Sequence, residues 1–205
     1  MYKYIRSVLA RRTFAHKLRN KAMNTFSSYE IFNSIREKQE QNRQIEKRPH
    51  EVLYFHKVDD PYSHLTVQYL DKLKDSYDIV LKPILVGEEN PETLHEPSLY
   101  NKYCLEDVRR IATYYQIEFT ADSYPLKNLV DLANSILSIV EKENFNDIAR
   151  DVSSALWNNE EDKLKEISTK YSASKDEVNK KLSEGNKIRN ECDYYFGSAF
   201  YYEKE

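Results

Sequence analysis

Residues 52–65 read VLYFHKVDDPYSHL, a short apolar run followed by the start of a helix. The run over residues 52–55 is rich in strand-forming side chains without alternation, which is typical of a strand covered on both faces. Asp60 favours the N-cap of the helix, and Pro61 suits its first position because the missing N–H needs no partner there. Apolar residues at helical spacing then supply one face, namely Leu65, Tyr69, Leu70 and Leu73. The sequence therefore predicts a central strand that leads directly into a helix.

A second strand is predicted over residues 79–86, which read IVLKPILV. Pro83 has no N–H to give to a sheet, so we expect this strand at an edge or at a bulge. A strand, a helix and a strand of this length together predict a right-handed parallel crossover.

The rest of the chain is predicted to be mainly helical. We expect irregular structure over residues 87–100, where Pro91 and Pro97 interrupt any regular pattern. Helical patterns follow at residues 103–116, 126–141, 144–157, 160–171 and 174–193. A last strand is predicted over residues 198–202, which read SAFYY.

Composition bounds the class of protein. A chain of 205 residues with 40% hydrophobic residues can bury one sizeable core, so we expect one domain with an appendage, and Trp157 in that core. No apolar run is long enough for a membrane-spanning helix. Cys104 and Cys192 lack the spacing of a disulfide framework or a zinc cluster, and we expect both to be buried free thiols. A reducing, cytoplasmic location is the prediction that follows.

Residues 1–48 form a basic segment. Residues 1–49 carry 12 Lys and Arg against 4 Asp and Glu, which leaves 19 against 30 for residues 50–205. Helices are predicted over residues 2–22 and 28–47, with thin apolar stripes that need a partner surface. We expect the basic side chains to be solvated, or to dock on the acidic part of this chain or of a partner. Contact with nucleic acid or a membrane is less expected, because aromatic residues that could stack on nucleobases are not interleaved with the Lys and Arg residues. An organelle presequence is a second interpretation of residues 1–24.

The order of these elements resembles the DsbA-type thioredoxin superfamily, which includes the 2-hydroxychromene-2-carboxylate isomerases and the kappa-class glutathione transferases. The resemblance rests on residues 53–55 and 60–65, on Tyr124-Pro125 before a helix, and on residues 197–202. It implies a thioredoxin-like α/β domain over residues 49–205, with a helical insertion at about 88–193 and a basic helical extension over 1–48. The closing strand and helix of that fold have no counterpart in these 205 residues.

The resemblance also implies where the site lies. Oxidoreductases of that superfamily carry cysteines at the places of Asp60 and Ser63, whereas the isomerases and kappa-class transferases carry Ser-Pro-Tyr-Ser or similar. We therefore expect no dithiol chemistry, but a helix start whose free N–H groups stabilise an anion such as the sulfur of glutathione, the candidate cofactor. His64 is suited to act as an acid or base near neutral pH. The candidate catalytic residues are Ser63, His64 and Asp60, and the candidate ligand contacts are Pro61, Tyr62 and Ser198.

Two functions follow from this resemblance, and the sequence leaves open whether the protein is an enzyme. The first is a relative of these isomerases that binds a small thiol or organic acid at residues 60–64. The second is a redox-inactive thioredoxin-fold module for binding or assembly, with a second thioredoxin-like domain or a second copy as partner. The missing cysteines favour the second function. So does the lack of a proline near residues 197–199, where the superfamily has a cis-proline loop.

Each candidate residue also has a plain structural interpretation. Asp60 can be an ordinary N-cap, Ser63 a first-turn residue that bonds locally, and His64 a half-buried histidine. A metal site formed by His56, Asp59, Asp60 and His64 is a further alternative, although such spacing is common by chance.

Overall fold

The computed structural model describes residues 14–25, 28–87 and 96–203. The chain divides into two compact units, Met1–Pro49 and His50–Glu205. We call the described residues of the second unit the body. Within the described residues, no helix is both long enough and apolar enough to cross a bilayer.

The first unit contains a helix over residues 14–25 and α2 (Tyr29–Glu46). Ser28 caps α2 by accepting a hydrogen bond from the N–H of Ile31 at 3.4 Å, and Lys47 ends it in a left-handed conformation with a φ of 53°. The predicted helix over 28–47 is confirmed, as is the part of the 2–22 helix from residue 14 onward; the earlier residues lie outside the described chain. No residue of α2 is buried.

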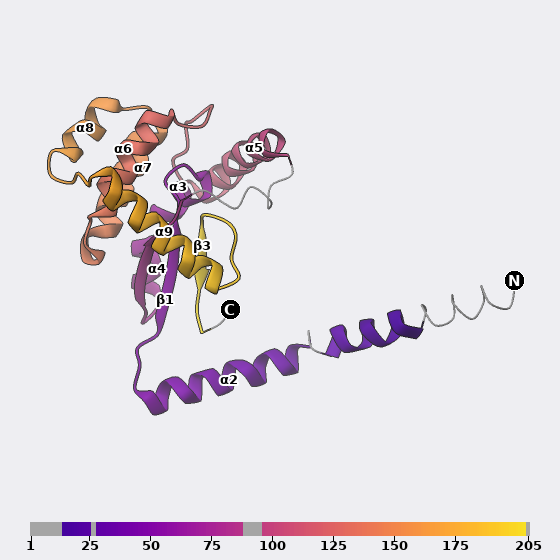
Figure 1. Cartoon of the computed structure of the whole chain (residues 1–205). Helices are drawn as coiled ribbons and strands as arrows, with labels where there is room; N and C mark the ends of the chain where they lie inside the picture. Colours follow the sequence, from indigo (N-terminus) through magenta and orange to yellow (C-terminus); the bar gives the residue numbers. More distant parts are fainter. Residues whose placement is uncertain (1–13, 26–27, 88–95, 204–205) are drawn as a thin grey trace, which may run out of the picture. The chain divides into compact units, whose positions relative to one another are not determined.

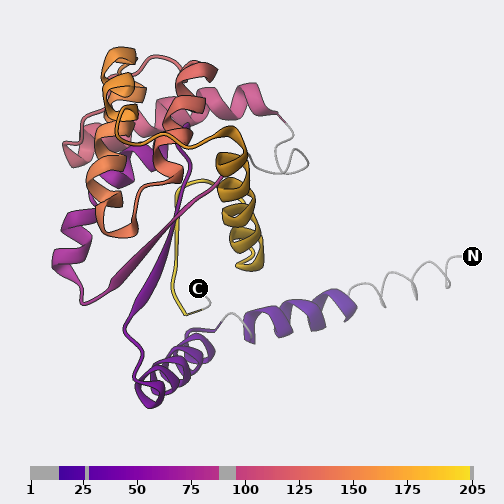
Figure 2. The same cartoon turned by 60° about the vertical axis from the view of Figure 1, so that its left-hand side comes forward.

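The body is built on a mixed sheet of three strands, β1 (Glu51–His56), β2 (Val80–Leu85) and β3 (Ala199–Tyr201), in the order β2-β1-β3 (Figure 2). β1 pairs with β2 in parallel and with β3 antiparallel, so that Tyr54 stands opposite both Pro83 and Phe200. The predicted central strand, the parallel crossover and the late strand are confirmed. Pro83 lies in the edge strand β2, as its missing N–H predicts.

The helix that follows β1 is broken in two. α3 (Pro61–Val67) begins at the predicted residue, but Gln68 ends it, and α4 (Leu70–Ser76) resumes the chain. Leu65 and Leu70 are buried, whereas Tyr69 and Leu73 are half-buried. The predicted apolar face is therefore divided between two short helices.

The remaining helices are α5 (Pro97–Tyr115), α6 (Lys127–Ser138), the 3₁₀ turn η2 (Lys142–Asn144), α7 (Phe145–Trp157), α8 (Glu161–Ser168) and α9 (Lys175–Glu191). Two predictions need correction. Residues 97–100 are helical rather than irregular, because Pro97 occupies the first turn of α5, where a proline is tolerated. The predicted helix over 126–141 stops at Ser138, before η2.

Helices cover both faces of the sheet. Tyr54 and His56 point to the face covered by α3 and α7, since Tyr54 bonds to Ser63 and His56 packs edge-on against Phe145. The other face meets α9, which crosses β2 at Gly185 (Figure 2). A Cβ atom at Gly185 would lie 1.9 Å from the carbonyl oxygen of Leu85, so only glycine permits this approach.

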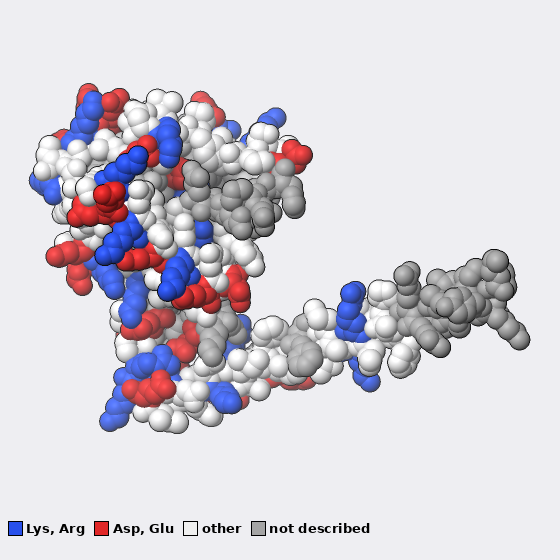
Figure 3. Space-filling model, viewed as in Figure 1, with Lys and Arg blue, Asp and Glu red and all other residues white. Residues whose placement is uncertain are grey.

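The core of the body joins the sheet to the helical region. Figure 1 shows α6, α7 and α8 gathered beyond the carboxyl end of β1. Trp157 is buried there as predicted, and its indole N–H donates to the carbonyl of Val58 at 3.3 Å. On the face shown in Figure 3, basic and acidic side chains of the body are interspersed over the surface.

Candidate functional site

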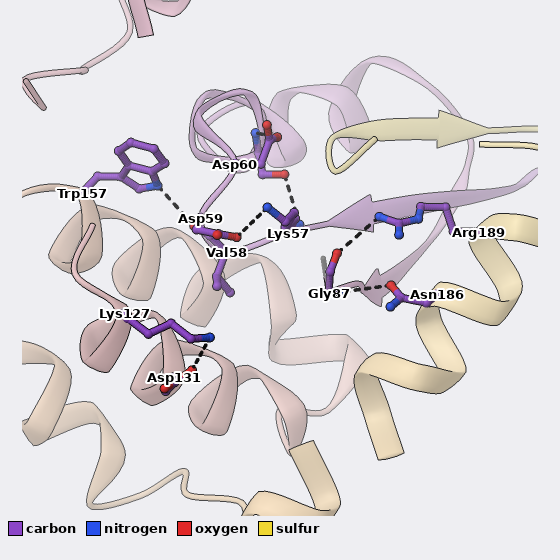
Figure 4. Close-up of polar contacts among 11 residues, drawn as sticks. Lys57, Val58, Asp59, Asp60, Gly87, Lys127, Asp131, Trp157, Asn186 and Arg189 are labelled. Carbon is purple, nitrogen blue, oxygen red and sulfur yellow. Dashed lines mark hydrogen bonds and ion pairs between the residues drawn. The ribbon is translucent and has the colours of Figure 1, made fainter. Parts of the chain in front are cut away.

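The start of α3 uses its own carboxylate as a cap. The side chain of Asp60 accepts a hydrogen bond from the backbone N–H of Ser63 at 2.7 Å (Figure 4). This N–H is one of the donors that would otherwise stabilise a bound anion at the helix start. The plain N-cap interpretation of Asp60 is therefore confirmed.

Ser63 is enclosed in the body, with 0% of its surface exposed. Its hydroxyl oxygen accepts the backbone N–H of Lys57 at 3.2 Å, and its carbonyl accepts the hydroxyl of Tyr54 at 3.4 Å. The serine thereby ties the turn after β1 to the first turn of α3. A ligand does not reach this hydroxyl in the conformation described.

His64 is a core histidine, 6% exposed. Its Nδ1 lies 2.9 Å from the hydroxyl oxygen of Ser153 on α7, and its ring stacks on Trp157 at a centroid distance of 5.9 Å. Desolvation lowers the pKa of His64 from its ordinary value to about 4, so the imidazole is neutral near pH 7. The other ring nitrogen, Nε2, lies 3.4 Å from the side-chain nitrogen of Gln68.

The predicted ligand contacts also have partners within the body. Pro61 is buried, and the Tyr62 hydroxyl donates to Asp107 on α5 at 2.8 Å. The hydroxyl of Ser198 lies 2.8 Å from that of Thr66, one turn beyond the helix start.

The segment before β3 packs directly on the helix start. A Cβ atom at Gly197 would lie 2.8 Å from the Cβ of Lys57 and 2.9 Å from the Cβ of Asp60. The described backbone contains no cis peptide. Residues 197–198 therefore lie against the first turn of α3, with Gly197 packed on the side chains of Lys57 and Asp60.

The four candidate metal ligands do not converge. His56 is fully buried, and its Nδ1 lies 3.0 Å from the hydroxyl of Tyr54, while Asp59 pairs with Lys57 at 3.0 Å. Among the described residues, no group of three or more His, Cys, Asp or Glu side chains could hold a metal ion. Cys104 is buried and Cys192 half-buried, and desolvation raises the pKa of both thiols, which keeps them protonated near pH 7.

A cleft of about 930 Å³ opens where the carboxyl ends of β1 and β2 meet the helical region (Figure 4). Its floor is formed by Asp59, which follows β1, and by residues 86–87, which follow β2; α6 and α9 form the walls. Its polar lining comprises Asp59, Lys127, Asp131, Asn134, Ser135, Lys175, Asn179, Ser183 and Asn186. Small molecules commonly bind in such crevices beyond the carboxyl ends of parallel strands.

Side chains of α9 fix the end of β2 at this cleft. The Oδ1 atom of Asn186 accepts the N–H of Gly87 at 2.9 Å, and the buried Arg189 donates to the carbonyl of Gly87 at 3.5 Å (Figure 4). Together with the close crossing at Gly185, these bonds hold the strand end against α9.

The fixed charges of the cleft are largely balanced in pairs. Lys127 pairs with Asp131 at 3.0 Å along α6, as Lys57 does with Asp59 at the floor (Figure 4). Such pairs leave a polar but nearly neutral surface, with apolar patches at Val130, Val178 and Leu182. The cleft is therefore suited to a small ligand of mixed polarity.

Sequence reasoning placed the site at residues 60–64 and missed this cleft. Only Asp59 adjoins the predicted stretch, because the other polar lining residues come from α6 and α9, far away in sequence. One signal could have indicated the cleft. Ligands often bind beyond the carboxyl ends of parallel strands, and residues 86–87 directly follow the second predicted strand. No protein-family model matches the sequence, and a search of curated proteins also finds no match.

Proposed function

We propose that residues 50–203 form a thioredoxin-like domain without dithiol chemistry, which binds a small thiol compound or organic acid in the cleft between α6, α9 and the strand ends. The observation that carries this proposal is the position of the cleft, about 930 Å³ in volume, beyond the carboxyl ends of two parallel strands.

The topology supports the thioredoxin-like assignment. A parallel strand, helix and strand unit is followed, after the helical region, by a strand antiparallel to β1 on its other side. The helix after β1 begins at Asp60-Pro61-Tyr62-Ser63, the place of the superfamily's cysteine pair. This strand order and these directions are compatible with a thioredoxin-like fold.

The contacts at residues 60–64 support a ligand that sits in the cleft rather than on the helix start. Asp60 consumes a first-turn N–H, Gly197 covers the turn, and Ser63 is enclosed. A negative carboxylate at the cap also disfavours a thiolate there. The cleft offers space without disturbing these contacts.

Titration with glutathione and with succinate, followed by backbone ¹H–¹⁵N NMR, tests the proposal. We expect saturable shifts at Gly87, Asn179 and Asn186, with smaller changes at residues 62–64. The variant Ser183→Trp places a large ring on the cleft wall and should abolish these shifts. Lys180→Trp on the same helix, outside the cleft lining, should leave them in place. Absence of shifts with both compounds at millimolar concentration would refute the proposal.

A second candidate function is that of an assembly module, and a different surface favours it. An apolar groove of about 360 Å³ runs beside β3, with Leu65, Leu70, Leu73 and Phe200 in its lining. Within the described chain no strand pairs with the outer side of β3, and Phe200 is 39% exposed. An unpaired edge beside apolar side chains suits a second copy of the chain.

Light scattering of the eluting protein tests this second function. The assembly function is supported if the protein is a dimer, if Phe200→Glu converts it to a monomer, and if Tyr195→Glu leaves the dimer intact. A monomer at all accessible concentrations would exclude a second copy as the partner.

A further inference from the structure

The helix over residues 14–25 in the first unit is exposed along its whole length. Each of its residues is exposed, including Phe14 at 70% and Leu18 at 60%. Single exposed apolar residues are normal, but these two are neighbours one turn apart on the same helix. A helix this short gains most of its stability by packing its apolar side chains. We therefore expect it to have a partner surface.

The side chains of this helix are sorted by type around its axis. Phe14, Leu18 and Ala22 follow one another at intervals of four residues, which places them on one face. The opposite face is polar and comprises His16, Asn20 and Asn24. The helix is therefore amphipathic, with its apolar face open to solvent.

Basic side chains border the apolar face on both sides. Lys17 and Lys21 run along one edge, and Arg19 lies at the other edge. Lys and Arg side chains project from this helix in Figure 3. Residues 1–24 carry seven Lys and Arg and no acid, whereas the four acidic residues of the first unit all belong to α2. The positive charge is thus concentrated around the apolar face of one helix.

We propose that the helix over residues 14–25 binds the surface of a membrane rich in anionic lipids. Its apolar face enters the boundary between headgroups and acyl chains, and its lysines and arginine contact the lipid phosphates. This inference goes beyond the proposed function, which concerns only the body.

The arrangement of charge and apolar groups selects this partner over other anionic ones. A lipid surface presents phosphates and hydrocarbon side by side, in the same order in which the helix presents cations and apolar side chains. Nucleic acid also attracts the cations, but it offers no hydrocarbon layer for Phe14 and Leu18. An acidic protein surface matches the charge alone.

Co-sedimentation of the full chain with lipid vesicles tests the proposal. One set of vesicles is phosphatidylcholine alone, and the other contains about one-third phosphatidylglycerol. We expect binding to the anionic vesicles only, and weaker binding as the salt concentration rises, because salt screens the attraction between exposed charges.

A pair of double variants tests the charges. Lys17→Gln with Lys21→Gln should weaken binding to the anionic vesicles roughly 10- to 30-fold, since each basic residue near such a surface contributes about a factor of five. Lys170→Gln with Lys180→Gln removes the same charge from exposed positions of the body and should leave binding unchanged.

Two single variants test the apolar face. Leu18→Ser should weaken vesicle binding roughly 5- to 20-fold by removing a side chain that enters the lipid. Met23→Ser is the matched control, because Met23 is 59% exposed on the same helix but lies away from the apolar face. It should leave binding nearly unchanged.

Several results would overturn the proposal. These are equal binding to both kinds of vesicle, binding to neither, equal losses in Leu18→Ser and Met23→Ser, and equal losses in the two lysine double variants. Binding of a short DNA duplex without binding to the anionic vesicles would also overturn it, and would assign the basic helix to nucleic acid instead.

Discussion

Gly197 lies so close to Asp60 that a Cβ atom added to it would come within 2.9 Å of the aspartate Cβ. Two segments far apart in sequence therefore pack together: the backbone of the turn into β3 lies against side chains of the turn into α3. The closeness explains why a glycine stands at residue 197, since no positive φ requires one there.

The variant Gly197→Ala should destabilise the body by about 1–3 kcal/mol, because the methyl group forces the two turns apart. Urea unfolding measures this loss. Gly87→Ala is the matched control, since its Cβ would meet neighbours only at ordinary distances of 3.5–3.6 Å. Equal stability of the two variants would show that the turns separate without cost.

Gly185→Ala should have the largest effect of the glycine variants, because the new Cβ would lie 1.9 Å from the carbonyl oxygen of Leu85 in β2. To relieve this clash, α9 must move away from the sheet. That movement weakens the hydrogen bonds that join Gly87 to Asn186 and Arg189. We expect a loss of about 3 kcal/mol or more. Hydrogen exchange at Gly87 should rise in step; unchanged protection there would contradict this account.

Asp60→Ala should cost about 0.5–2 kcal/mol by removing the cap of α3. Asp60→Asn keeps a capping oxygen and should restore most of the stability, since an amide oxygen can still accept the N–H of Ser63. Thermal melts of both variants check the prediction. Equal losses in the two would mean that the negative charge, rather than the cap bond, is what matters.

Stability should rise with pH between about pH 5 and 6.5, because two buried histidines are neutral in the folded state. Desolvation lowers the pKa of His56 to about 3 and that of His64 to about 4, below the ordinary value of 6.5. The unfolded state therefore binds more protons in this range, and stability falls as pH drops below the unfolded pKa. Each histidine contributes a slope of up to about 1.4 kcal/mol per pH unit.

Urea unfolding at several pH values measures this slope. His64→Gln removes one titrating group and should reduce the slope by about half. A slope that survives the His64 substitution would assign the dependence to other groups.

Much of the sheet could be predicted because its signals are local. The run at residues 52–55, the Asp60-Pro61 start and Pro83 in an edge strand each reflect a rule about one strand or one helix end. The break at Gln68 and the early start of α5 at Pro97 were missed, because helix-forming patterns do not mark where tertiary packing divides or extends a helix.

The site was harder to predict, since burial is not a local property. Ser63 and His64 have the residue types expected of a reactive centre, yet contacts with Lys57, Ser153 and Trp157 enclose them. The cleft depends on α6 and α9 being brought to the end of β2, and no local motif indicates that arrangement; α9 is placed there by its close crossing at Gly185.

Trp157 gives this protein an intrinsic optical reporter. It is the single tryptophan in the sequence, and its indole N–H bonds to the carbonyl of Val58, the residue before Asp59 at the cleft floor. The same ring stacks on His64. Its fluorescence therefore monitors, without any label, both the floor of the cleft and the charge state of a core histidine.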